Sequence, residues 1–319
     1  MNNETLKEMT RQIMPWLIEI RRDFHMHPEL SGREQRTAGI VADRLRDYGL
    51  KVSTGVGGHG VIGLLEGKRD GPVVAWRADM DAVPGDEVLN APYKSCVPGV
   101  VHICGHDAHT TIGLGIAQVL ASMRDQVAGQ VKFIFQPAEE TVVGARAIID
   151  AGGLEDPRPG AIFALHIAPL PVGRLGSVAR MVLPGMTNFR VVIKNAAAPP
   201  LIETCLQSIR SVSTVGFPSS AEGLTEFLDS MEAGSEVLDR FIVIYCWPNQ
   251  EQSVENRQVI DGVARTATEE LWGQVPGLIR SKLGDALGKA SVTYELEWPE
   301  RMSFPAALND TGLELELRP

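Results

Sequence analysis

The sequence predicts an α/β protein with two domains: a larger one built on a mostly parallel sheet flanked by helices, and a smaller α+β domain. Three observations predict this fold class. Strand-like and helical segments alternate between residues 60 and 167. The strand-like segments are apolar along their whole length, as in strands that are buried on both faces. After about residue 184, strands and long helices follow one another without that tight alternation, which is typical of an α+β domain.

Two helices are expected before the first strand. Residues 5–24 carry apolar residues at roughly helical spacing. Residues 34–48 follow the stretch "HPELSGRE", in which Ser31 and Glu34 have the spacing of a capping box. Gly49 then ends the second helix, because glycine readily adopts the left-handed conformation found after helix ends. The first helix has no uninterrupted apolar run and no cleavage pattern, so it does not read as a signal peptide.

The remaining elements are predicted from short apolar runs and from helical spacing. In the larger domain we expect strands at 60–67, 72–78, 129–137 and 160–167, and helices at 110–124 and 143–151. In the smaller domain we expect strands at 187–195, 240–247 and 290–299, and helices at 200–214 and 269–287. In open α/β sheets, ligands gather beyond the carboxyl ends of the strands. The residues just after the strands of the larger domain are therefore the candidates for a site.

Composition excludes several classes of partner. The formal net charge is −10 and the chain has no block of Lys and Arg, which argues against nucleic acid and acidic membrane surfaces. No apolar run reaches the roughly 18 residues that a membrane span needs. The four cysteines (Cys96, Cys104, Cys205 and Cys246) are widely spaced and do not look like a disulfide framework. We therefore expect a protein of the reducing cytoplasm.

Polar clusters stand at the ends of the predicted strands and before one helix. They share the side chains that bind zinc and similar ions: thiolate, imidazole and carboxylate. The clusters are Asp79 and Asp81 after 72–78, Glu139 and Glu140 after 129–137, His166 at the end of 160–167, and Cys104 and His106 before 110–124. Their coincidence at one edge of a sheet predicts a metal site.

Each cluster alone also has a plainer interpretation. A Cys-X-His pair is often structural, two adjacent glutamates are often a solvated surface, and Asp-X-Asp after a strand is often a turn and helix cap. Taken alone, His166 could also be a buried histidine that is hydrogen-bonded within the core and binds no metal. We expect His102 and His109 to support the site without binding the ion, and we leave Asp79 unassigned.

A pair of glutamates has a chemical use beside a metal. One carboxylate can bind the ion, and its neighbour can hold a water molecule and take its proton. A bound metal lowers the pKa of that water from about 16 toward about 7, so a modest base is sufficient near neutral pH.

Four stretches resemble one family closely: "RADMDAVP", "HICGHDAHT", "FIFQPAEE" followed by "GARAIIDAG", and "ALHIAPLPVG". The chain resembles the metal-dependent amidohydrolases of the aminoacylase and carboxypeptidase G metallopeptidase family, in the branch of hippurate hydrolase, N-acyl-amino-acid amidohydrolases and indole-acetyl-amino-acid hydrolases. The resemblance covers roughly residues 15–185. It implies a catalytic domain at 1–184, continued by 299–319, and a lid or dimerisation domain at 185–298.

The resemblance also implies roles for individual residues. Cys104 would bridge two divalent ions, His106 and His166 would complete one metal site, and Glu140 would serve the second. Glu139 would be the general base, and Asp81 would orient a ligand or the base. The implied reaction is hydrolysis of an N-acyl amino acid, hippurate-like or N-acetylated, to a carboxylic acid and an amino acid. The implied metal is Zn, Mn, Co or Ni, and a homodimer through the lid domain is implied as well.

The chain departs from the family pattern because no histidine occurs after His166. The family's lid-domain histidine is replaced by the stretch "IKNAAAPPLIE", and the C-terminal histidine of its second metal site has no counterpart. We therefore expect one well-held ion and an incomplete second site. Two alternatives stay open: a truncated or degenerate member that binds metal with little or no activity, and an unrelated protein with a structural Cys/His site.

Overall fold

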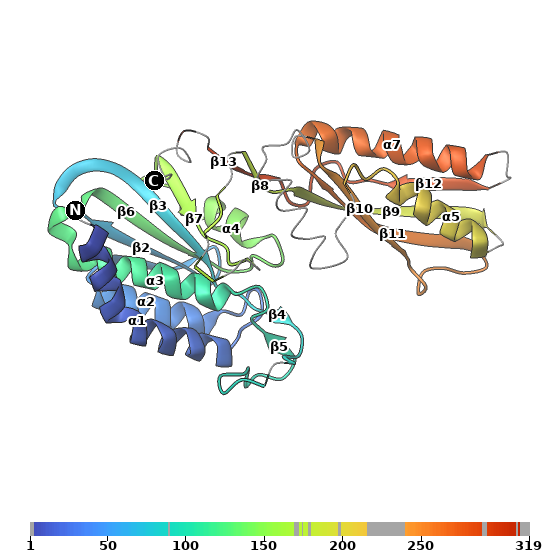
Figure 1. Ribbon diagram of the computed structural model, residues 1–319. Coiled ribbons are helices and arrows are strands. Elements are labelled where there is room, and N and C mark those ends of the chain that lie inside the picture. Colours follow the sequence, from blue (N-terminus) through green and yellow to red (C-terminus); the bar gives the residue numbers. More distant parts are fainter. Residues whose placement is uncertain are drawn as a thin grey trace. The chain divides into compact units, whose positions relative to one another are not determined.

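A computed structural model describes residues 3–88, 90–168, 172–173, 175–177, 180–196, 199–215, 240–288, 292–310 and 312 (Figure 1). The chain forms two compact units, residues 1–171 and residues 172–319. The domain limits expected from the sequence, 1–184 with 299–319 and 185–298, stay a prediction.

The first unit is built on a five-stranded sheet in the order β1-β2-β6-β3-β7. Its strands are β1 (Lys51–Val56), β2 (Gly60–Glu66), β3 (Arg69–Asp79), β6 (Ala128–Gln136) and β7 (Ala161–Ala164). β3 pairs in parallel with β6 and with β7. β2 is antiparallel to both β6 and β1, so it alone runs against the other strands of the sheet. The expected α/β class with a mostly parallel sheet is confirmed.

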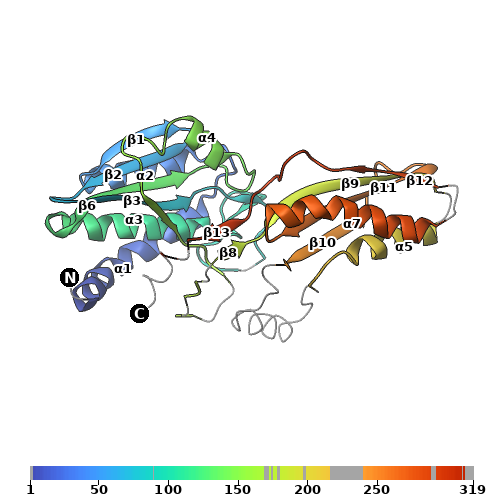
Figure 2. The same cartoon turned by 90° about the horizontal axis from the view of Figure 1, so that it is seen from above.

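Helices cover both faces of this sheet (Figure 2). On one face lie α1 (Asn3–Met26), α2 (Gln35–Asp47) and α3 (His106–Ser122), and on the other lies α4 (Gly144–Asp150). Alternation along β6 divides its side chains: Phe133 and Phe135 join the core under the three helices, whereas Ile134 packs toward α4. A short pair, β4 (Val83–Pro84) and β5 (Val100–Val101), and one 3₁₀ turn (Arg124–Gln126) complete the unit.

The start of α2 corrects one expectation. The Ser31 hydroxyl and the Glu34 carboxyl do not form a capping box, and the Glu34 side chain makes no cap hydrogen bond to α2. The carboxylate of Glu29 instead accepts the backbone N–H groups of Arg36 and Thr37, at 2.9 and 2.8 Å. Ser31 and Glu34 make hydrogen bonds to residues far away in the sequence, because the tertiary fold brings other donors and acceptors closer.

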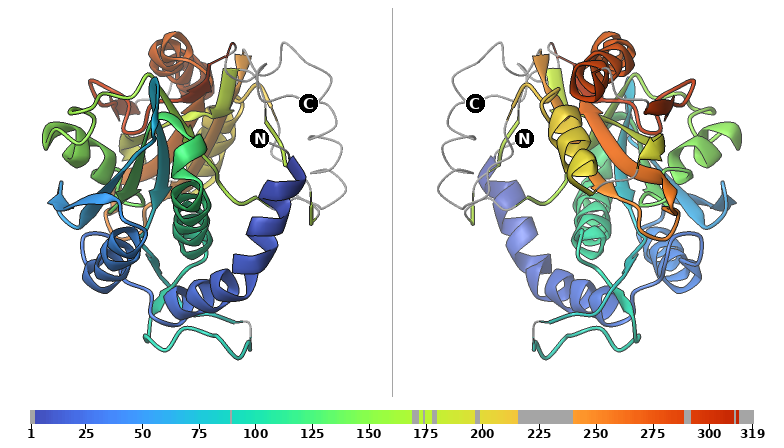
Figure 3. Two further views of the ribbon diagram at one scale, coloured as in Figure 1. Left: turned by 90° about the vertical axis from the view of Figure 1, so that its left-hand side faces the viewer. Right: turned by 90° about the vertical axis from the view of Figure 1, so that its right-hand side faces the viewer.

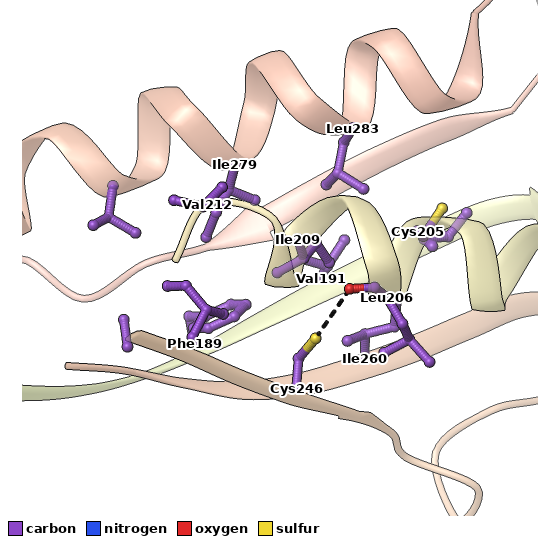
Figure 4. Packing of buried hydrophobic residues seen from close by; sticks show 14 of the residues in the cluster. Phe189, Val191, Cys205, Leu206, Ile209, Val212, Cys246, Ile260, Ile279 and Leu283 are labelled. Carbon is purple, nitrogen blue, oxygen red and sulfur yellow. Dashed lines mark hydrogen bonds between the residues drawn. The ribbon is translucent and has the colours of Figure 1, made fainter. Parts of the chain in front are cut away.

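The second unit is an antiparallel sheet covered on one face by two helices. The sheet order is β10-β11-β9-β12, formed by β9 (Gly185–Ala196), β10 (Ile242–Pro248), β11 (Asn256–Thr266) and β12 (Thr293–Glu297). The helices are α5 (Pro199–Arg210) and α7 (Glu269–Leu287). Figure 4 shows Ile279 and Leu283 of α7 pointing toward the sheet, with Leu206 and Ile209 of α5 in the same cluster as Val191 and Ile260 of the sheet. A further pair is formed by β8 (Arg180–Leu183) and β13 (Ala307–Asn309).

An apolar groove of about 730 Å³ runs between α1 and α3 in the first unit. It is lined by aliphatic side chains of both helices, among them Ile13, Leu17 and Ile18 of α1 and Ile112 and Ile116 of α3. α1 bends along its length and diverges from α3 toward its N-terminal end (Figure 3). Within the described residues, no helix is both long enough and apolar enough to cross a membrane.

Candidate metal centre

The sheet edge of the first unit brings the predicted site residues together. β3 ends at Asp79, β6 ends at Gln136 shortly before the two glutamates, and β7 ends at Ala164 just before His166. These three strands are parallel neighbours, so the residues after them emerge at the same edge. α3 begins at His106, and the loop before it carries Cys104 to the same edge.

Cys104 faces His166 across the edge. Sγ of Cys104 lies 3.6 Å from Nε2 of His166. Nδ1 of His166 lies 2.6 Å from the carbonyl oxygen of Ile167, and we assign the ring proton to that nitrogen. The lone pair on Nε2 of His166 then points toward Sγ of Cys104. Two ligands of one tetrahedral zinc ion lie about 3.5 Å apart at ordinary bond lengths, so this separation fits a shared cation.

Gly105 permits this approach. Its φ of +81° is a conformation that side-chain-bearing residues rarely adopt. A Cβ at this position would overlap the side chain of Ile167. The glycine between Cys104 and His106 therefore lets the loop lie directly against the segment that carries His166.

His106 is the centre of the cluster and has no exposed surface. Its Nδ1 lies 3.2 Å from Oδ1 of Asp81, so the proton on Nδ1 is donated to that carboxylate. Its Nε2 is buried and has no hydrogen-bond partner among the described residues. A histidine whose first nitrogen is held by a carboxylate presents the second to a metal in many metal sites. With Nδ1 held by Asp81, Nε2 of His106 could bind a divalent ion.

Glu139 and Glu140 lie on the other side of the imidazole. Oε2 of Glu139 is 3.8 Å and Oε1 of Glu140 is 3.7 Å from Nε2 of His106. Oε1 of Glu140 is also buried without a hydrogen-bond partner in the described part of the chain. Leaving buried polar atoms unpaired is costly, so this oxygen and Nε2 of His106 together fit the binding of a cation.

Three overlapping groups of side chains could hold an ion in the described residues. In each group the ligand atoms lie within 4.8 Å of one another. The groups are Cys104, His106 and His166; His106, Glu139 and Glu140; and Asp79, His106 and His109. The first two consist of residues singled out in the sequence.

The third group contains Asp79, which the sequence left unassigned, and His109, which was expected to support the site without binding the ion. Nδ1 of His109 lies 2.6 Å from Oδ1 of Asp79, and Nε2 of His109 accepts the N–H of Ile167 at 2.9 Å. The other oxygen of Asp79 accepts a hydrogen bond from Arg77 at 2.6 Å. Both nitrogens of His109 and both oxygens of Asp79 are thus engaged. The signal that could have found this pair is the position of Asp79 at the strand end, with a histidine one turn into the following helix.

The cluster is strongly anionic, and its carboxylates shift the pKa of the central histidine. Burial disfavours a charged His106, but its hydrogen bond to Asp81 and the charge of Asp79 outweigh burial and raise its pKa to about 11. Burial also opposes ionisation of Asp79, yet His109 and Arg77 hold its pKa well below the usual range. The surroundings of His106 therefore favour a positive charge at this point.

Glu139 differs from the other acids of the site. Burial, followed by the negative charge of Asp79, raises the pKa of Glu139 above its ordinary value. A carboxyl with a raised pKa takes up a proton more readily near neutral pH, which suits a general base.

A family model described as "Peptidase family M20/M25/M40" matches residues 75–317, more than half of the chain. The chain belongs to this family. The family resemblance inferred from the sequence motifs is confirmed. A solved Bacillus subtilis structure described as a dinuclear metal-binding peptidase of the M20 family superposes with a TM-score of 0.74 at 29% identity, and the match covers 97% of this chain and 78% of that one.

Several curated relatives match a little over half of the chain. The N-acetylcysteine deacetylase of Bacillus subtilis is 42% identical over 180 residues, which is 56% of this chain and 47% of that protein. The IAA-amino acid hydrolase ILR1-like 5 of Arabidopsis thaliana is 42% identical over 179 residues, which is 56% of this chain and 40% of that protein. The chain thus spans about half the length of the curated relatives it matches.

Proposed function

We propose that this protein is a metal-dependent amidohydrolase that cleaves the amide bond of N-acyl amino acids. The observation that carries the proposal is the convergence of a thiol, two imidazoles and two carboxylates at one sheet edge. Two similar proteins are named as a deacetylase of N-acetylcysteine and as a hydrolase of an amino acid conjugate. Membership of the M20 family supports the same reaction class.

Cys104, His106 and His166 would hold the first ion. Three protein ligands leave a position open for water or substrate, as in catalytic zinc sites. Glu140 and Cys104 would hold a second ion. Among the described residues, no candidate ion-binding group contains both Cys104 and Glu140, so this second site is the less complete of the two. We propose one tightly held ion of Zn, Mn, Co or Ni and a weaker second one.

The chain's own residues would carry the proton transfers. A bound divalent ion supplies Lewis-acid polarisation of the substrate carbonyl and acidifies a water molecule. Glu139 accepts the proton of the attacking water and then passes it to the leaving nitrogen. Asp81 keeps His106 in the tautomer that presents Nε2 to the site, through the 3.2 Å contact with Nδ1.

A second candidate function is suggested by the candidate ion-binding groups, none of which contains both Cys104 and Glu140 within the described residues. With an incomplete second site, the chain would bind metal but turn over substrate slowly or not at all.

A homodimer through residues 185–298 and a cytoplasmic location also remain proposals.

Turnover assays distinguish the two candidates. The purified chain would be incubated with Zn²⁺, Mn²⁺, Co²⁺ or Ni²⁺ and a panel of hippurate, N-acetyl amino acids and indole-acetyl amino acids. The proposed hydrolase releases free amino acid in a metal-dependent manner, and chelation stops the release. Bound metal with release at the no-enzyme baseline for every substrate would instead support the metal-binding candidate.

A further inference from the structure

Glu34 is a buried carboxyl group with no part in the proposed chemistry. Its side chain has no exposed surface. One oxygen, Oε1, accepts the backbone N–H groups of Gly32 and Ala138, each at 2.8 Å. The other oxygen is buried without a hydrogen-bond partner among the described residues. Burying a carboxyl in this way is unfavourable unless the fold uses the contacts that it makes.

The contact to Ala138 is made at a demanding point of the backbone. Ala138 directly precedes Glu139 and Glu140 and has a φ of +50°, which side-chain-bearing residues rarely adopt. The carbonyl group of Ala138 accepts the N–H of Gly144 at 3.1 Å, so the turn is also tied to the start of α4. The Glu34 carboxyl is the partner that satisfies the N–H of this residue.

The stretch that carries Glu34 holds the same turn at a second point. The hydroxyl of Ser31 donates to Oδ2 of Asp81 at 2.6 Å. That same oxygen accepts the backbone N–H of Glu140 at 3.0 Å. The backbone of Ala82 is also fixed to this stretch, because its N–H donates to the carbonyl group of Glu29 at 2.8 Å. Glu34 thus holds the turn directly at Ala138, and Ser31 holds it through Asp81 at Glu140.

From this geometry we propose that Glu34 is a positioning residue. It fixes the turn at Ala138 so that the side chains of Glu139 and Glu140 point at His106. A role as helix cap does not explain it, because its side chain makes no cap hydrogen bond and Glu29 caps α2. The proposal deepens the proposed function and rests on it for the roles of Glu139 and Glu140.

Two substitutions separate the hydrogen bond from the charge. Glu34→Gln keeps a carbonyl oxygen at the same distance along the side chain and can still accept the N–H of Ala138. Glu34→Asp keeps the carboxyl but withdraws it by one methylene. With the metal-loaded chain and its best substrate from the panel, kcat falls by about 10-fold or more in Glu34→Asp while KM changes little, because a small misplacement of a catalytic group is costly. Glu34→Gln keeps most of the kcat of the unsubstituted chain.

Glu29→Asp is the matched control. It shortens a carboxylate of the same stretch whose hydrogen bonds go to the backbone of α2. Its kcat stays close to that of the unsubstituted chain, even if its melting temperature falls. Equal losses of kcat in Glu29→Asp and Glu34→Asp would overturn the proposal, since both would then reflect general destabilisation.

Amide hydrogen exchange tests the proposal without any turnover. Exchange at the Ala138 amide becomes faster in Glu34→Asp and stays slow in Glu34→Gln and Glu29→Asp, each measured well below its melting temperature. Unchanged exchange at Ala138 in Glu34→Asp would overturn the positioning role. Failure of the unsubstituted chain to hydrolyse any substrate would contradict the proposed function instead, and the exchange result would still decide what Glu34 does to the turn.

Discussion

Sγ of Cys104 and Nε2 of His166 lie 3.6 Å apart although 62 positions separate the two residues in the sequence. Cys104 is on the loop before α3, and His166 comes after β7. Two ligand-type atoms from separate elements meet at the distance expected of a shared cation. His106 completes a candidate ion-binding group with these two residues, and its buried Nε2 has no hydrogen-bond partner in the described part of the chain. The proposed metal centre rests on this relationship.

Glu139→Gln separates binding from chemistry. The amide has nearly the shape of the carboxylate but cannot accept the proton of the attacking water. We expect a loss of about 10²-fold or more in kcat, within the range for removal of a general base. Metal content, measured by mass spectrometry of the purified protein, stays unchanged. Activity close to that of the unsubstituted chain would remove Glu139 from its proposed role.

The acid side of the pH–rate profile reports on Glu139. Burial and the charge of Asp79 raise its pKa above the ordinary value of 4.5. A base works only when it is deprotonated, so kcat falls as the pH falls through this raised pKa. Asp79→Asn removes the charge that raises the pKa, so the fall in kcat moves to lower pH. The measurement is kcat across acidic pH for both proteins, and a shift to higher pH in the variant would contradict the assignment.

His102 makes stability depend on pH in the opposite sense from a paired histidine. Burial lowers its pKa from 6.5 to about 4, so the folded chain keeps this ring neutral while the unfolded chain protonates it. Stability is therefore lost as the pH falls from 6.5 toward 4. At about 1.4 kcal/mol per pKa unit, the loss from this group reaches up to about 3 kcal/mol.

His102→Gln provides the comparison, because glutamine does not titrate. The free energy of unfolding in urea should fall less steeply between neutral and acidic pH in the variant than in the unsubstituted chain. Parallel curves for the two proteins would show that His102 does not carry this dependence.

The groove between α1 and α3 exposes apolar surface that favours association. Ile18 lines it and is 44% exposed. Ile18→Glu places an acid four residues before Arg22 on α1, a favourable helical spacing, so the helix should be retained. We expect less self-association at high concentration, measured by sedimentation velocity. Glu19→Gln, which does not line the groove, is the control, and equal behaviour of the two variants would contradict the prediction.

Much of the site could be predicted from the sequence because hydrophobic runs mark strand ends. The runs before Asp79, Glu139 and His166 form neighbouring strands, and parallel strands deliver the residues after them to one edge of the sheet. Side-chain partners across the fold could not be predicted in this way. Ser31 meets Asp81 across 50 positions, a relation that tertiary packing sets and local spacing does not encode. Local spacing suggested a capping box at Ser31 instead.

Two strands of the two larger sheets were also missed for physical reasons. β1 (Lys51–Val56) is largely exposed at the edge of its sheet, so its sequence lacks the apolar run of a buried strand. β11 (Asn256–Thr266) carries polar residues among its buried ones, since one face of its sheet is not covered by α5 and α7. Sequence patterns therefore found the strands that build the site more readily than these two.

Cobalt(II) substitution tests the central claim most directly. A thiolate bound to Co²⁺ gives an intense near-ultraviolet charge-transfer band, which imidazole and carboxylate ligands do not give. We predict that the Co²⁺-loaded chain shows this band, that Cys104→Ser abolishes it, and that Cys96→Ser, at an exposed cysteine outside the candidate groups, leaves it intact. A Co²⁺-loaded chain whose spectrum lacks the band, or one that keeps it in Cys104→Ser, would contradict the account of this metal centre.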